Sequence, residues 1–229
     1  EIIAYHGALR MMDHSIPLNQ ESPVFRLISA FEERIKTSTS QIIGRTEVEM
    51  PYQENLKHRQ DLPLGTFVCE ALREFGRADL AIINSGAIRD RLPAGNITMG
   101  TIYTTFPFDN TVMTLKLKGS DIQSMLDYIA GKYGKISGFQ YGGLRFQMNL
   151  ASGTASDVRV GEQPLEAGKE YKLATISYLT DGNQHGNILF KNAYDLFDSG
   201  FFVRDVIMEY MRNHGSIKSP PAGLIRFSP

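Results

Sequence analysis

The stretch "AIINSGAIRDRL", residues 81–92, joins a run of apolar residues directly to small polar ones. Its apolar part, "DLAIIN" (79–84), is continuous rather than alternating, which is typical of a strand buried on both faces of a sheet. Beyond it, Gly86 allows a positive φ or a close approach by a ligand. Asn84 offers a donor and an acceptor, and Arg89 a rigid fork of donors. Two interpretations are open: a binding site at the strand end, or a turn with a surface ion pair.

Four segments carry apolar residues at helical spacing. The second lies between Pro63, which suits a first turn, and Gly76, which suits a helix end. Ser120 is placed to cap the third. Cys69 lies beside the second apolar stripe, and we interpret it as a small buried residue rather than a nucleophile. The four apolar faces are Val24, Leu27, Ile28, Phe31 and Ile35; Leu64, Phe67, Val68, Ala71, Leu72 and Phe75; Ile122, Met125, Leu126, Ile129 and Ala130; and Val203, Val206, Ile207, Tyr210 and Met211.

Strand patterns are mixed with these helices without a steady repeat. "QIIGRTEVEM" (41–50) is typical of extended chain, and "NTVMTLKLKG" (110–119) has the period of two expected of a half-buried strand. "GGLRFQMNLASGTASDVRV" (142–160) indicates a hairpin, "EYKLATISYL" (170–179) a further strand, and "GLIRFS" (223–228) a closing strand. We therefore expect an α+β fold with mixed β-sheets packed with helices, rather than a doubly wound parallel sheet.

Composition limits the classes of function. The 229 residues are 42% apolar, enough for one large domain or one domain with a smaller attached piece. The formal net charge is −1 and the basic residues are dispersed, so we expect a small-molecule partner and no nucleic acid. No apolar run reaches the length of about 18 residues that suggests a membrane span. The single cysteine excludes an internal disulfide and a Cys-based zinc cluster, and leaves the compartment open.

Two further loops are candidates for ligand binding. In "TTFPFDN" (104–110), Phe106 and Phe108 flank a proline; either both rings belong to the core, or one packs on a planar ligand. "SYLTDGNQHGN" (177–187) is an aromatic residue followed by a polar, Gly-rich loop, which can wrap a sugar or a phosphate or form an ordinary turn. His185 has no ligand partner at metal-binding spacing, so we interpret it as a solvated loop residue.

Motifs for hydrolysis are missing from the sequence. It contains no carboxylate and histidine set typical of a two-metal phosphoesterase, no nucleophile elbow and no Walker loop. We therefore predict that this fragment alone is inactive as a hydrolase.

Six stretches in this order resemble the C-terminal domain of the 5'-nucleotidase family, which includes periplasmic UDP-sugar hydrolases and 2',3'-cyclic nucleotide phosphodiesterases. The resemblance implies a substrate-binding domain over 40–229, an interdomain linker helix over 23–39, and the tail of a metallophosphatase domain with a linker over 1–22. The stretches are "LGTFVCEAL", "INSGAIR", "NITMGTIYTTFPFDNTVMTLKLKGSDI", "GFQYGGLRF", "YKLATISYLTDGN" and "GLIRFS".

The resemblance also implies how function is divided. In that family an N-terminal domain holds two divalent metals that activate water, while the C-terminal domain binds the nucleoside and rotates to present it. This fragment is then expected to bind no metal itself. Its partners are expected to be a nucleoside or nucleotide and a metallophosphatase domain, in the same chain or a separate one. By the same analogy the location is periplasmic or secreted.

Residue roles follow from the matched positions. Phe108 and Tyr178 match the two aromatic residues that sandwich the base, and such stacking tolerates any base. Asn84 and Arg89 match residues that hydrogen-bond the base or ribose and the substrate oxygens. Gly86 and Asp181 belong to the same matched loops and are included as substrate-binding residues.

Two positions depart from the family pattern. Gln184 stands where an aspartate usually holds the ribose hydroxyls, and a neutral amide binds them without charge assistance. His185 stands where glycine is usual. Arg59 lies close to the position of a further substrate-facing arginine. Other interpretations remain open: a stand-alone nucleoside-binding module without catalysis, the same domain of a cyclic phosphodiesterase or UDP-sugar hydrolase, or a fold that has lost its ligand.

Overall fold

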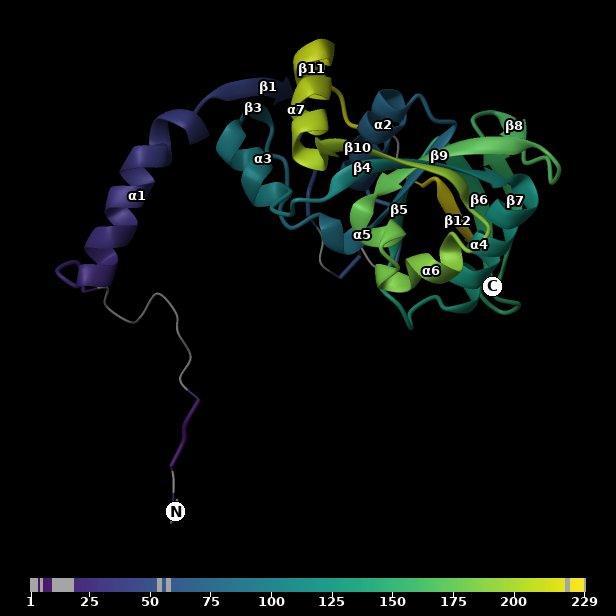
Figure 1. Ribbon diagram of the computed structural model, residues 1–229, viewed down its shortest axis with the longest axis horizontal. Coiled ribbons are helices and arrows are strands. Elements are labelled where there is room, and N and C mark those ends of the chain that lie inside the picture. The colour runs from purple at the N-terminus through teal and green to yellow at the C-terminus, as the bar shows by residue number, and fades with distance from the viewer. Residues whose placement is uncertain are drawn as a thin grey trace. The chain divides into compact units, whose positions relative to one another are not determined.

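The computed structural model describes residues 4, 6–9, 19–52, 55–56, 59–220 and 223–228. The chain forms two compact units, Glu1–Thr39 and Ser40–Pro229 (Figure 1). Most of the segment up to residue 22 lies outside the described residues. The first unit contains helix α1 (Pro23–Thr39), as the apolar spacing predicts, and none of its residues is buried.

The second unit is built on a mixed five-stranded sheet with strand order β10-β4-β9-β2-β5. Its strands are β2 (Leu80–Asn84), β4 (Thr111–Lys118), β5 (Phe139–Gly142), β9 (Glu170–Ile176) and β10 (Tyr194–Phe202). Strand β2 is parallel to β9 and antiparallel to β5, and every residue of β2 is buried. The expected α+β class and the doubly buried strand are both confirmed.

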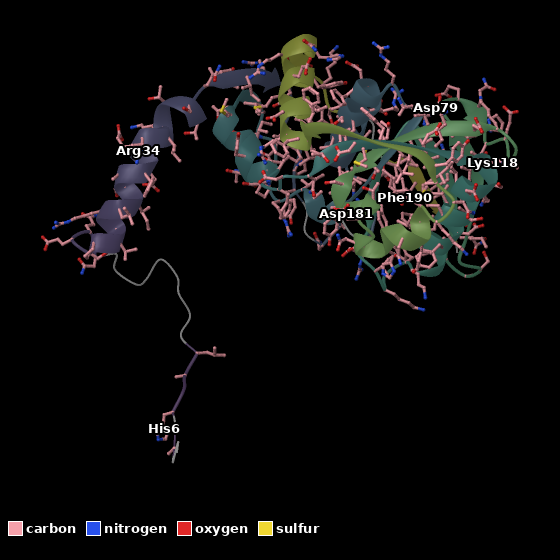
Figure 2. The ribbon with its side chains drawn as sticks, in the orientation of Figure 1. His6, Arg34, Asp79, Lys118, Asp181 and Phe190 are labelled. Carbon is pink, nitrogen blue, oxygen red and sulfur yellow. The ribbon has the colours of Figure 1, made fainter. Side chains whose placement is uncertain are left out.

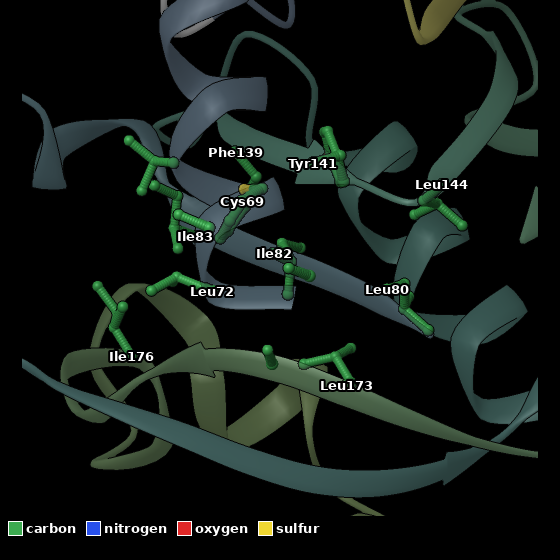
Figure 3. Packing of buried hydrophobic residues seen from close by; sticks show 14 of the residues in the cluster. Cys69, Leu72, Leu80, Ile82, Ile83, Phe139, Tyr141, Leu144, Leu173 and Ile176 are labelled. Atoms are coloured by element: carbon green, nitrogen blue, oxygen red, sulfur yellow. The ribbon is translucent and has the colours of Figure 1, made fainter. Parts of the chain in front are cut away.

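Helix α2 (Pro63–Gly76) packs on this sheet against β2, β5 and β9. Cys69 and Leu72 of the helix lie beside Ile82 and Ile83 of strand β2 (Figure 3). Helix α4 (Gly119–Gly131) contacts β4, and helix α7 (Val203–His214) packs against α2. The apolar stripes predicted for these three helices supply much of the buried core.

Two smaller sheets extend the unit. One has the order β12-β6-β7-β8, formed by β6 (Leu144–Asn149), β7 (Thr154–Val160), β8 (Gln163–Pro164) and β12 (Ile225–Ser228). The predicted hairpin is β6–β7, and the predicted closing strand is β12, which pairs parallel to β6. The other sheet has the order β11-β1-β3, formed by β1 (Ile42–Thr46), β3 (Gly95–Thr98) and β11 (Ser216–Ile217).

Strand β4 differs from its expected half-buried pattern. Thr114 and Leu115 are adjacent, so their side chains point to opposite faces of the sheet, and both are buried. Thr114 lies under α2, where a Cβ on Gly76 would approach its methyl group to 2.9 Å. Alternating polar and apolar residues indicate a solvated face only when no other element covers that face of the sheet. Strand β4 is covered on both faces.

The predicted cap of α4 is wrong. The helix begins at Gly119, after Lys118, without a side-chain cap. The Ser120 backbone N–H donates to the Ala167 carbonyl at 2.9 Å instead. A Cβ on Gly119 would lie 2.1 Å from the Glu166 carbonyl, so the close approach of the 166–167 turn sets where this helix begins.

Cys69 is completely buried, as predicted, and is expected to be unreactive in the folded protein. Burial first, and then the Glu70 carboxylate, raise the pKa of its thiol well above the usual value. Because the thiolate is the nucleophile, we expect no reaction with a chromogenic disulfide reagent at pH 8, and one thiol titrated after denaturation in guanidinium. Reaction of the folded protein at the rate of free cysteine would contradict this prediction.

Candidate functional site

Four loops converge at one edge of the five-stranded sheet. Strands β2 and β9 are parallel and in register, so both end at this edge. Strands β4 and β5 run antiparallel to them and begin there, with Val112 paired to Ile176 and Phe139 paired to Asn84. The segments 84–89, 106–110, 135–138 and 177–185 are therefore neighbours. All of the predicted site residues except Arg59 lie on these segments.

Asn84 ends β2 and is buried, with 7% of its surface exposed. Its Oδ1 atom is buried and has no hydrogen-bond partner among the described residues. The next residue is held firmly: the Ser85 N–H donates to the Gly138 carbonyl at 2.9 Å, and Gln140 Nε2 donates to Ser85 Oγ at 2.8 Å. A buried acceptor without a partner is costly, so a donor on a ligand would stabilise it.

Gly86 lies in a 3-10 turn, η1 (Ser85–Ala87). Its φ is not positive, which leaves close approach as the reason for a glycine here. A Cβ at this position would lie 3.2 Å from Asn84 Nδ2. The missing side chain therefore leaves space next to the Asn84 amide nitrogen.

The structure brings Arg89 and Phe108 together. The exposed guanidinium carbon of Arg89 lies 5.1 Å from the centroid of the Phe108 ring, which is a cation–π distance. The two phenylalanines of the "FPF" motif separate: Phe106 is in the core with 4% exposed, while 40% of Phe108 is exposed. Beneath Phe108 is an apolar hollow, lined by Val68, Ile83, Ala87, Phe106, Asn110, Ile176 and Val203.

Tyr178 lies on the short helix α5 (Ser177–Thr180), directly after β9, and 38% of it is exposed. Ser177 Oγ accepts a hydrogen bond from the Thr111 backbone N–H at 3.1 Å, which ties α5 to the start of β4. Asp181, at the end of α5, is exposed, and its backbone N–H donates to the Ser177 carbonyl. Figure 2 labels Asp181 and also Phe190, which follows helix α6 (Gly186–Leu189).

Gln184 and His185 both have left-handed backbone conformations, with φ of 48° and 65°, in the turn η2 (Asn183–His185). Such conformations are costly for residues other than glycine and concentrate at functional sites. Gln184 Nε2 donates to the Ser137 carbonyl at 3.4 Å. The interpretation of His185 as a solvated loop residue is wrong, because it is half-buried and its Nδ1 lies 3.0 Å from the Tyr128 hydroxyl.

Arg59 is exposed in a turn, where its backbone N–H donates to the Leu56 carbonyl. Among the described residues the structure does not bring its side chain into contact with the other candidates. Its inclusion in the site therefore stays a prediction.

Sequence reasoning missed Arg204, which lies in the first turn of α7 with 9% of its surface exposed. Its Nη1 donates to the Phe108 carbonyl at 3.1 Å and lies 2.5 Å from Asp109 Oδ1. Helical spacing places Arg204 at the margin of the apolar stripe of α7, three residues before Ile207 and seven before Met211. Nothing local in the sequence indicates that it reaches a loop almost a hundred residues earlier.

Residues 42–191 match the family described as 5'-nucleotidase, C-terminal domain. The chain belongs to this family. It is 25% identical over 212 residues to Protein UshA of Yersinia enterocolitica, an alignment that covers 92% of this chain and 38% of that protein. It is 24% identical over 228 residues to the 5'-nucleotidase of Vibrio cholerae, covering 97% of this chain and 40% of that protein.

The fold of this 5'-nucleotidase C-terminal domain is also that of a solved relative. The crystal structure of a 5'-nucleotidase precursor from Thermus thermophilus superposes with a TM-score of 0.80 at 24% identity. The match covers 89% of this chain and 43% of that one. This chain thus spans well under half the length of the relatives that it matches.

Metal-binding clusters and membrane-spanning helices are both absent from the described residues. Within them no group of three or more His, Cys, Asp or Glu side chains is arranged to hold a metal ion. None of the helices in the same ranges has both the length and the apolar character needed to cross a bilayer.

Proposed function

We propose that residues 40–229 bind the nucleoside part of a phosphate ester for a 5'-nucleotidase-type hydrolase. One observation carries this proposal: Phe108 and Tyr178 are partly exposed and lie on loops at the same sheet edge as Asn84, whose buried Oδ1 has no partner among the described residues. A nucleoside, with its flat base and its amino and hydroxyl donors, could satisfy both the exposed rings and the Asn84 oxygen. It offers two faces for stacking and a donor for the amide oxygen.

In this proposal each residue has a physical role. Phe108 and Tyr178 stack on the two faces of the base. Asn84 hydrogen-bonds the base or ribose, and Gly86 leaves room for that contact. Arg89 leaves the face of Phe108 to contact substrate oxygens, while Asp181 and Gln184 are positioned for the ribose hydroxyls.

The chemical step belongs, in the same proposal, to a metallophosphatase domain outside residues 1–229, in the same chain or in a separate one. That domain would hold two divalent cations that activate the attacking water. In this proposal residues 40–229 carry no catalytic step. This chain binds and orients the nucleoside. A periplasmic or secreted location follows from family analogy alone.

A stand-alone nucleoside-binding module is the second candidate, because the proposed binding residues other than Arg59 all lie within residues 84–184. The upstream coding sequence distinguishes the two. Metal-binding Asp, His and Asn motifs before residue 1 would support the hydrolase. A signal peptide ending near residue 1 would support the module.

Calorimetric titration of this chain with adenosine, uridine and UDP-glucose tests the proposal. We expect saturable binding of adenosine and uridine with similar affinities, because stacking tolerates different bases. UDP-glucose binding in addition would extend the substrate class to nucleotide sugars. No binding of any of the three to a folded sample would overturn the proposal.

A further inference from the structure

Arg204 occupies a position in helix α7 that is unfavourable for a positively charged side chain. It occupies the first turn of α7, where the positive end of the helix dipole disfavours a cation. It is also nine-tenths buried, and its Nε atom has no hydrogen-bond partner among the described residues. A buried guanidinium at such a position is costly unless its other contacts compensate. Helix formation and core packing therefore do not explain it.

Two kinds of contact compensate for the burial of the Arg204 guanidinium. It makes polar contacts with the loop that carries Phe108, and it packs against two aromatic rings. Arg204 Nη1 contacts two successive residues, the carbonyl of Phe108 at 3.1 Å and the carboxylate of Asp109 at 2.5 Å. The Asp109 side chain is 74% exposed, so the ion pair joins a carboxylate at the protein surface to a guanidinium that is mostly buried. Charge-assisted bonds of this kind are roughly twice as strong as neutral ones.

Two aromatic rings also pack against the guanidinium of Arg204. Its Cζ lies 4.9 Å from the centroid of Tyr103, in helix α3 (Met99–Thr105), and 4.7 Å from that of Phe202. Next to Arg204, the Val203 backbone N–H donates to the Asn110 carbonyl at 2.9 Å. The first turn of α7 thus makes a polar contact with each of the three successive residues 108–110.

We infer that Arg204 is a positioning residue for nucleoside binding: it fixes the backbone of Phe108 so that the ring is held in its stacking position before the ligand arrives. The inference rests on the proposed function. A loop ordered in advance does not lose conformational freedom on binding, so the gain appears as affinity. Arg204 itself touches no ligand; it acts through the Phe108 carbonyl.

The test compares adenosine affinity, by calorimetry, between the wild-type chain and Arg204→Met, which keeps the length of the side chain and removes the donors. We expect affinity to fall about tenfold, the equivalent of one lost charge-assisted hydrogen bond. Hydrogen exchange of the 108–110 amides should become faster in the same variant. The matched control is Arg212→Met on the exposed face of α7, which should change neither quantity.

A double-mutant cycle separates positioning from a general structural effect. If Arg204 acts through the ring, the variant carrying both Arg204→Met and Phe108→Ala should bind no more weakly than Phe108→Ala alone. Additive losses would overturn the inference. Unchanged affinity and unchanged exchange in Arg204→Met would overturn it as well.

Two milder variants serve if Arg204→Met does not fold. Arg204→Lys keeps the charge but not the fork, and Asp109→Asn removes only the charge of the exposed partner, whose oxygen can still accept a hydrogen bond. Each should weaken adenosine binding by about threefold, the lower range for a lost polar contact. Wild-type affinity in both would overturn the inference. If the wild-type chain binds no nucleoside, the proposed function fails, while the exchange measurement still decides whether Arg204 orders the loop.

Discussion

Replacing Phe108 by alanine is expected to weaken nucleoside binding by about 5- to 150-fold, because stacking on one aromatic ring contributes about 1–3 kcal/mol per base. The ring is already 40% exposed, so its removal creates little cavity and the fold should remain. Calorimetric titration with adenosine and with uridine measures the loss, which should be similar for the two bases. Arg89 loses its cation–π partner in the same variant.

The control for this experiment is Phe227→Ala. Phe227 has the same exposed fraction, 40%, and lies on β12, which belongs to a different sheet. Its removal should leave nucleoside affinity unchanged. If Phe108→Ala binds as tightly as Phe227→Ala does, the stacking role is wrong, even where the wild-type chain binds nucleosides.

Gly186→Ala should destabilise the domain by about 3 kcal/mol, the upper range for overpacking. A Cβ at residue 186 would lie 1.8 Å from the Leu179 carbonyl oxygen, and this neighbour is backbone that cannot rotate away. Leu179 follows Tyr178 in α5, so any relaxation moves the second stacking ring. We therefore expect a lower midpoint of urea unfolding together with weaker nucleoside binding.

Gly168→Ala is the matched substitution for this prediction. No atom lies within 4 Å of a Cβ at residue 168, and its φ is one that alanine adopts. Its free energy of unfolding should change by less than about 0.5 kcal/mol. Equal stability of the two variants would show that α5 and α6 can separate without cost, contrary to the packing described above.

Much of the fold could be predicted because its signals are local. The spacing of Leu64, Phe67 and Leu72 places α2, and the unbroken run of β2 indicates burial on both faces. Strand β10 and helix α3 had no such signal. The sequence of β10, "YDLFDSGFF", is interrupted by bulges where its pairing with β4 shifts, so neither periodicity appears.

The candidate site was predicted less evenly. Phe108 was recognised through its motif, yet only packing separates it from Phe106, two residues away and buried. His185 was misinterpreted because its partner, the Tyr128 hydroxyl, comes from a helix 57 residues earlier. Arg204 gave no signal, since its role depends on contacts with Phe108 and Asp109, 96 and 95 positions away along the chain.

The sequence by itself determined the four long helices and the burial of β2 on both faces, because backbone geometry repeats every 3.6 or every 2 residues and apolar side chains follow that repeat. Only the tertiary structure decided that the ends of β2 and β9 and the starts of β4 and β5 meet at one edge. That meeting depends on strand order and direction, which are set by long-range packing and leave no periodic trace in the chain.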